Sequence, residues 1–158
     1  MKTLLSLSMA VLGFALIPAL PAAEKEKHHS HDHEKRESGP NGGRVVFSVE
    51  PHFEFFVMPD RKVKITFLGE DKKAIAPTDQ TVSAISGKRS KPTKMEFTRE
   101  AGALVSDKPL PEGERVPIVL RVKAFPDAKT VTEKFTVDMA DCAECDLKEY
   151  ACVCDHEH

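Results

Sequence analysis

The sequence predicts an all-β protein, an antiparallel β-sandwich of the immunoglobulin-like kind with seven or eight strands. Short segments of alternating apolar and polar residues recur about every ten to fifteen residues, which is typical of strands. Turns rich in Gly and Pro separate these segments, and no helical pattern lies between them. Such a series is typical of a sandwich, and a small barrel is the alternative that it leaves open.

We assign the β-sandwich domain to residues 38–138. In each expected strand, every second residue is apolar and would face the core. All of these residues precede residue 138, so we expect the core to close without the tail that follows. The expected inward-facing residues are Val45, Phe47, Val49, Phe53, Phe55, Val57, Val63, Ile65, Phe67, Val82, Ala84, Met95, Phe97, Leu104, Ile118, Leu120, Val122, Val131, Phe135 and Val137.

Residues 1–22 have the composition of a secretory signal peptide. Lys2 supplies the positive charge, residues 4–17 form an apolar segment, and Pro18 breaks the helix before a cleavage site of small residues. The apolar segment is short for a bilayer span, although an uncleaved anchor is the alternative. We therefore expect a periplasmic or secreted protein that is not attached to a membrane after cleavage.

Residues 23–37 form a polar, His-rich segment that we expect to be disordered, because it has almost no apolar surface to bury. Neutral imidazole binds Cu(II), Ni(II) and Zn(II), so we expect weak metal binding here. A solvated linker with incidental histidines is the alternative. The four histidines of this segment are His28, His29, His31 and His33.

Residues 139–158 form an acidic tail that contains all four cysteines of the chain. Two of these have the Cys-x-x-Cys spacing, which suits two ligands of one tetrahedral ion. Thiolate and imidazole together are ligands of Cu(I) and Zn(II), so the tail predicts a transition-metal site. The candidate ligands are Cys142, Cys145, Cys152, Cys154, His156 and His158.

The same four thiols could instead close two disulfides, which would make the tail part of a structural or interaction domain without a metal role. Redox catalysis is disfavoured, because neighbouring acidic residues raise the pKa of a thiol. Residues 143–151 are good helix formers, and we expect about two helical turns there. Three cysteines would then share one face, and a fold-back loop or an ion could gather all four.

Composition and motifs disfavour other functions. The formal net charge is −2, and the lysines are scattered, so no nucleic-acid partner is expected. We find no phosphate-binding loop, nucleophile elbow or metalloprotease helix, and therefore expect no enzymatic activity. His52, with Glu54 two residues later, is only a weak candidate for a site.

Several short segments resemble the small N-terminal β domain of periplasmic adaptor subunits from heavy-metal efflux pumps. They are His31-Asp-His33, the turn Gly39-Pro-Asn-Gly-Gly43-Arg44, Phe53-Glu-Phe55 and Val63-Lys-Ile-Thr-Phe67. The resemblance covers roughly residues 30–122. Asn41 stands where His is common in that family, the cysteine-rich end is not part of its pattern, and the other parts of an adaptor have no counterpart here.

The resemblance implies a stand-alone domain that handles an exported metal. Together with the candidate ligands, it predicts a protein that binds a Cu or Zn ion for sequestration or hand-off. A metal-efflux assembly is the expected partner.

Overall fold

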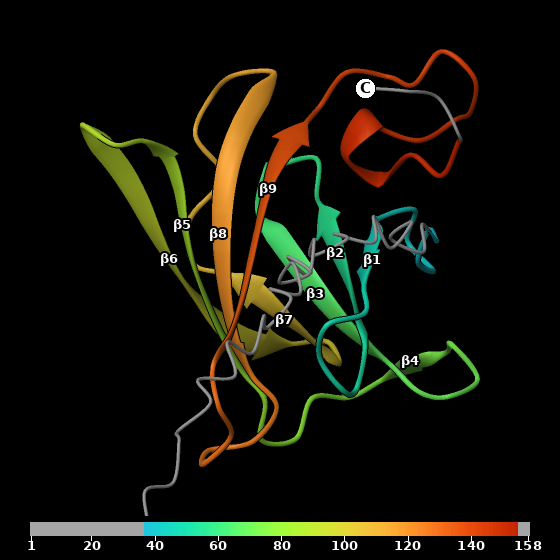
Figure 1. Ribbon diagram of the computed structural model, residues 1–158, viewed down its shortest axis with the longest axis vertical. Coiled ribbons are helices and arrows are strands. Elements are labelled where there is room, and N and C mark those ends of the chain that lie inside the picture. Colours follow the sequence, from blue (N-terminus) through green and yellow to red (C-terminus); the bar gives the residue numbers. More distant parts are fainter. Residues whose placement is uncertain (1–36, 155–158) are drawn as a thin grey trace, which may run out of the picture. The chain divides into compact units, whose positions relative to one another are not determined.

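The structure is a computed structural model that describes residues 37–154. In this range the chain forms a curled sheet in which all strand pairings are antiparallel (Figure 1). The strand order is β1-β2-β3-β7-β6-β5-β8-β9, and β4 pairs with β3. The predicted antiparallel all-β fold is confirmed. The strands are β1 (Arg44–Val46), β2 (Phe53–Val57), β3 (Val63–Leu68), β4 (Ala74–Ile75), β5 (Thr81–Lys88), β6 (Lys91–Glu100), β7 (Ala103–Ser106), β8 (Arg115–Lys123) and β9 (Val131–Asp138).

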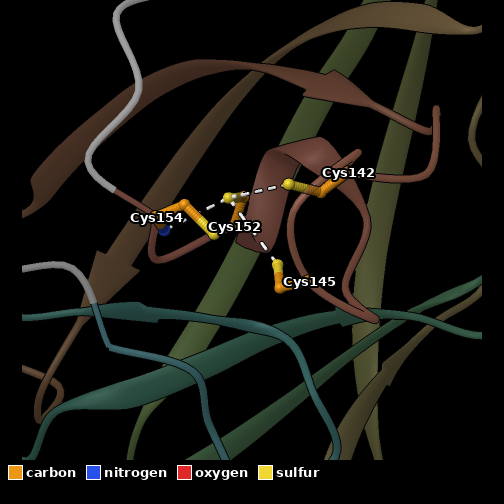
Figure 2. Close-up of side chains that lie close together, drawn as sticks. All are labelled: Cys142, Cys145, Cys152 and Cys154. Atoms are coloured by element: carbon orange, nitrogen blue, oxygen red, sulfur yellow. Dashed lines mark hydrogen bonds between the residues drawn. The ribbon is translucent and has the colours of Figure 1, made fainter.

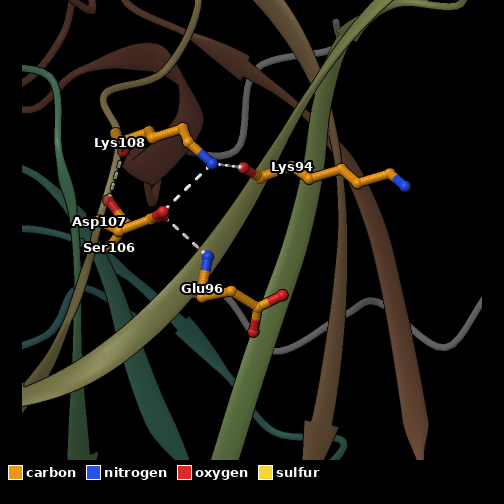
Figure 3. Close-up of polar contacts among 5 residues, drawn as sticks. All are labelled: Lys94, Glu96, Ser106, Asp107 and Lys108. Carbon is orange, nitrogen blue, oxygen red and sulfur yellow. Dashed lines mark hydrogen bonds and ion pairs between the residues drawn. The ribbon is translucent and has the colours of Figure 1, made fainter.

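Strand β6 belongs to both halves of the sheet, which allows the sheet to fold over on itself. It pairs with β5 as far as Glu96 and with β7 from Phe97 onward. The Asp107 carboxylate fixes this change of partner by accepting a hydrogen bond from the Glu96 N–H at 2.8 Å (Figure 3). This hydrogen bond lowers the pKa of Asp107 below its usual value of 3.8. The Lys108 ammonium also pairs with Asp107 at 3.2 Å and donates to the Lys94 carbonyl at 2.9 Å.

The two halves of the sheet face each other across one apolar core. Phe55 of β2 and Phe135 of β9 come from opposite ends of the strand order, yet their ring centroids lie 5.0 Å apart, edge to face. Ile65 of β3 and Leu120 of β8 are fully buried in the same cluster. Because burying a large apolar side chain contributes roughly 1.5–3 kcal/mol, this core drives the closure. The described strands β1 and β9 remain the two ends of the order, so a sandwich forms rather than a barrel.

Most of the inward-facing residues expected from the alternation are buried in the structure. The exceptions are half-buried side chains in the segment after β1, in the second part of β6 and on the edge strand β9. Positions at an edge or a bend lack a neighbour on one side, which leaves part of the side chain in contact with solvent. These half-buried residues are Phe47, Phe97, Val131 and Phe135.

The C-terminal tail packs against the open edge of the sandwich. Its 3₁₀ helix η1 (Glu149–Ala151) contacts both β1 and β9 (Figure 1). The Tyr150 ring lies edge-on to Phe55 with 5.8 Å between centroids, and its hydroxyl accepts a hydrogen bond from the Val57 N–H at 3.0 Å. Tyr150 and Ala151 are both part of the core. The core therefore extends beyond residue 137, where we expected it to end.

The tail contains less helix than predicted. We expected about two turns over residues 143–151, but η1 spans only three residues. The Cys142 N–H donates to the Leu147 carbonyl at 2.9 Å, and Asp141 and Lys148 form an antiparallel bridge. These contacts close a loop, which replaces the i to i−4 hydrogen bonds that a helix would need. Within residues 37–154, no helix has the length and apolar composition to cross a membrane.

Replacing Tyr150 by Phe should lower the free energy of unfolding by about 1–3 kcal/mol, because the buried Val57 N–H loses its acceptor. Tyr150→Ala should lower it by roughly 3–5 kcal/mol, because the substitution also leaves a cavity beside Phe55. Chemical denaturation measures both changes. Phe125→Ala is the control, since Phe125 is 56% exposed and its loss should change stability by less than about 0.5 kcal/mol. Wild-type stability in both Tyr150 variants would show that the tail is not anchored in the core.

Candidate metal centre

The first two cysteines lie on the loop that follows β9. The Asp141–Lys148 bridge closes this loop, and the two side chains also form an ion pair at 2.5 Å. A further hydrogen bond runs from the Glu149 N–H to the Ala140 carbonyl at 2.9 Å. The backbone between the two arms therefore turns tightly. This turn brings both sulfurs of the Cys142-x-x-Cys145 pair against one point, the Cys152 sulfur, as the spacing predicted (Figure 2).

The other two cysteines follow η1, on the strand-like end of the described chain. Ala151 is 3% exposed and anchors this segment in the core, directly before Cys152. The Cys152 N–H donates to the Glu149 carbonyl at 3.3 Å, which keeps the residue close to η1. The Cys154 N–H donates to the Cys152 sulfur, also at 3.3 Å. The chain thus folds back and brings its last cysteines against the loop.

All four sulfurs lie within 4.8 Å of one another (Figure 2). The Cys152 sulfur is 3.3 Å from that of Cys142 and 3.8 Å from that of Cys145. In a tetrahedral site with metal–sulfur bonds of about 2.3 Å, neighbouring sulfurs lie about 3.8 Å apart. The cluster therefore has nearly the dimensions of a four-sulfur site. None of the four cysteines is in a disulfide in this structure.

The four thiols have different acidities. A hydrogen bond from the Glu144 N–H to the Cys142 sulfur, 3.4 Å long, lowers the pKa of Cys142 to about 7. Burial raises the pKa of Cys152, and the hydrogen bond with Cys152 raises the pKa of Cys154. We expected the acidic surroundings to raise the pKa of these thiols, and for Cys142 this expectation is wrong. A direct hydrogen bond to the thiolate outweighs solvated charges at the surface.

This arrangement is suited to holding a soft or borderline ion. Its donor atoms are all sulfur, which selects for Cu(I), Zn(II) or iron–sulfur chemistry over the oxygen-binding ions Mg²⁺ and Ca²⁺. Two of the sulfurs already accept backbone N–H groups, contacts that orient a ligand and stabilise its charged form. The four cysteines could therefore bind an ion with little change in the backbone.

The structure brings together the four cysteines predicted as ligands and does not bring His52 to them. His52 is held locally, with Nδ1 2.9 Å from the Val49 carbonyl and Nε2 3.2 Å from the Glu50 carboxylate. The remaining candidate ligands lie outside the described residues. These are His28, His29, His31, His33, His156 and His158.

Glu54 has a role that the sequence did not indicate. Its carboxylate is fully buried and accepts hydrogen bonds from the N–H groups of Asn41 and Gly43, both at 2.8 Å. The Asn41 side-chain amide donates a third, at 2.5 Å. A Cβ atom on Gly39 would lie 2.5 Å from the Glu54 carboxyl carbon, so this turn requires glycine. Alternation with Phe53 and Phe55 predicts the opposite, solvent-facing side for Glu54, so no sequence pattern signalled this buried carboxylate.

Gly42 of this turn lies close to Leu147, in the loop that carries Cys142 and Cys145. A Cβ atom added to Gly42 would meet the Leu147 side chain at 3.3 Å. Gly42 has a positive φ of 81°, which favours glycine independently of the available space. The buried Glu54 carboxylate therefore helps to shape the surface on which the loop with Cys142 and Cys145 rests.

In the reduced, metal-free protein, one thiol should ionise near pH 7, before the others. Thiolate absorbance in the ultraviolet, followed as the pH rises, measures this step. The Cys142→Ser variant should lack it, because the thiol whose pKa is lowered to about 7 is then gone. Ala143→Ser adds a hydroxyl to the same loop, retains all four thiols and should leave the step unchanged. A first ionisation near the ordinary value of about 8.5 in the wild type would contradict the assignment.

Comparisons with known protein families, with curated proteins and with solved structures find no match for this chain. The resemblance to adaptor subunits of metal-efflux pumps therefore remains an expectation. The case for a metal centre rests on the geometry and chemistry of the four cysteines themselves.

Proposed function

We propose that this protein binds one transition-metal ion through its four cysteines. The observation that carries the proposal is that four sulfurs from two separate segments lie within 4.8 Å of one another. An ion at the centre would form four metal–sulfur bonds and release the protons of the thiols that are still protonated. The ligands would be Cys142, Cys145, Cys152 and Cys154.

The donor set favours Zn(II) or Cu(I). The separations of 3.3 and 3.8 Å from the Cys152 sulfur are close to those of a tetrahedral site, which is the usual geometry for Zn(II) bound to thiolates. Cu(I) also selects soft thiolate ligands and is the second ion to test. Four protein ligands would fill a tetrahedral site and leave no position for a substrate, so the proposed role is binding rather than catalysis.

The biological role that we propose is sequestration or hand-off of this ion outside the cytoplasm, near a metal-efflux system. Export is supported by the signal-like composition of residues 1–22. The four histidines of residues 23–37 would form a second, weaker class of site that collects divalent ions. His156 and His158 follow the last cysteine closely enough in sequence to supplement the four sulfurs.

One observation favours a second candidate function, a disulfide-stabilised structural or interaction domain. The Cys142 and Cys152 sulfurs are 3.3 Å apart, and a disulfide needs about 2.05 Å, so a small movement would join them. Cys145 and Cys154 would then be the second pair. An oxidising compartment favours this outcome unless a metal ion already holds the thiols.

Full-length protein loaded with zinc should contain one ion per chain in the cysteine site, as measured by elemental analysis. Its thiols should resist alkylation under native conditions until a chelator removes the ion, because metal-bound thiolates are shielded. Cys→Ser at any one of the four positions should weaken binding by more than about 100-fold, since loss of outer-shell partners alone costs 10–100-fold. Ala143→Ser, in the same loop, is the matched control and should bind zinc normally.

A chain in which His28, His29, His31 and His33 are all Ser separates the weaker sites from the cysteine site in the same titration. The metal proposal fails if the thiols react only after a reductant is added, whether or not a chelator is present. That result would instead support the disulfide-stabilised domain.

A further inference from the structure

The four cysteines are not equally accessible. Cys142 and Cys152 are only 8% and 7% exposed, whereas Cys145 and Cys154 are half-buried. The two inner sulfurs also each accept a backbone N–H, from Glu144 and Cys154 respectively. In Figure 2 the Cys152 side chain lies at the centre of the cluster, with Cys154 on one side, Cys142 on the other and Cys145 below. The site thus has an inner pair and an outer pair of ligands.

The surface around the outer pair is acidic. Glu144 and Asp146 are both exposed, and each lies next to Cys145 in the chain. The one lysine of the described tail, Lys148, is paired with Asp141 at 2.5 Å and so does not offset this charge. The β-sandwich domain, residues 38–138, by contrast carries more Lys and Arg than Asp and Glu. Negative charge is therefore concentrated beside the accessible ligands.

Next to Cys154, an apolar side chain is also exposed. Val153 is 37% exposed, and Ile75 and Phe125 are the other large apolar side chains exposed in residues 37–154. The acidic surface beside Cys145 and Cys154 favours a partner whose surface is positively charged. Val153 offers that partner one apolar contact.

We propose that the ion is exchanged through Cys145 and Cys154 with an acceptor that presents thiols on a positively charged surface. This proposal rests on the metal-binding function proposed above and adds the chemical class of the partner. An incoming sulfur can reach the ion only where the protein ligands are accessible. The acidic surface attracts a cationic acceptor and repels an anionic one.

The exchange involves no change in oxidation state. The acceptor thiol forms one metal–sulfur bond as the bond from Cys154 to the ion breaks, and the proton of the acceptor thiol passes to Cys154. A second acceptor thiol replaces Cys145 in the same way, which leaves the ion shared between the acceptor and the inner pair. Two further acceptor thiols then replace Cys142 and Cys152, and each passes its proton to the cysteine that it displaces.

The test uses full-length, zinc-loaded protein and two tripeptides, Lys-Cys-Lys and Glu-Cys-Glu, at equal thiolate concentrations. The rate of zinc removal is measured for each peptide. At low salt the cationic peptide should remove zinc about 10-fold faster, and the ratio should approach 1 at roughly 0.5 M salt, where surface charges are screened. Alkylation during the transfer, with the labelled sites mapped by mass spectrometry, should modify Cys145 and Cys154 before Cys142 and Cys152.

Charge variants identify the surface responsible. Glu144→Gln combined with Asp146→Asn should bring the two rates together at low salt. The matched control, Glu70→Gln combined with Asp79→Asn, removes the same charges from exposed positions outside the tail and should keep the ratio. Equal rates in the wild type, or earlier labelling of the inner pair, would overturn this inference alone. A chain that takes up no zinc in the loading step would overturn the metal-binding function as well.

Discussion

The hydrogen bond from the Val57 N–H to the Tyr150 hydroxyl is the contact on which the candidate site depends. It joins β2 to a residue 93 positions later in the chain and fixes the tail against the core. Cys152 follows Tyr150 by two residues. Because Tyr150 is fixed, Cys152 is held against the loop that carries Cys142. Such a non-local contact costs chain entropy, which the burial of Tyr150 and Ala151 in the core offsets. An ion bound by the four cysteines would link both arms of the tail and reinforce the same closure.

Short-range hydrogen bonds, rather than the charge of the tail, set the chemistry of the cluster. Acidic side chains surround the loop, but water and salt screen their effect. The Glu144 N–H lies 3.4 Å from the Cys142 sulfur and acts on it directly, so its pKa falls. Cys152 is more strongly affected by burial, and its pKa rises. A bound cation would favour the thiolate at all four positions, which couples metal binding to the release of protons.

Alternation made most of the fold predictable, because a strand with one face in the core must have apolar residues at every second position. The predicted inward-facing residues of β2 and β3 are buried as expected, among them Phe53, Phe55, Val63, Ile65 and Phe67. The clustering of the four cysteines was also predictable in kind, since the Cys-x-x-Cys spacing favours a shared site. Neither pattern indicates where the tail docks. That depends on Tyr150, the only tyrosine of the chain, which lies in an acidic segment with little periodicity.

The prediction of two helical turns over residues 143–151 was wrong because local propensity also does not show how the tail docks. Residues 143–151 contain good helix formers, but their backbone hydrogen bonds close a loop and a bridge instead, so only η1 is helical. Glu54 shows the same limit, because a charged residue on a strand suggests a solvent-facing position. The Asn41 and Gly43 N–H groups that satisfy its carboxylate come from a turn whose position the pattern does not give. Tertiary contacts decided both cases.

The central claim is that Cys142, Cys145, Cys152 and Cys154 bind one ion together. X-ray absorption at the zinc edge of the loaded, full-length protein tests it most directly, because it reports the number, type and distance of the ligand atoms. The expected result is a single shell of four sulfurs at about 2.3 Å. A shell dominated by nitrogen or oxygen, or one with two sulfurs or fewer, would contradict the four-cysteine centre.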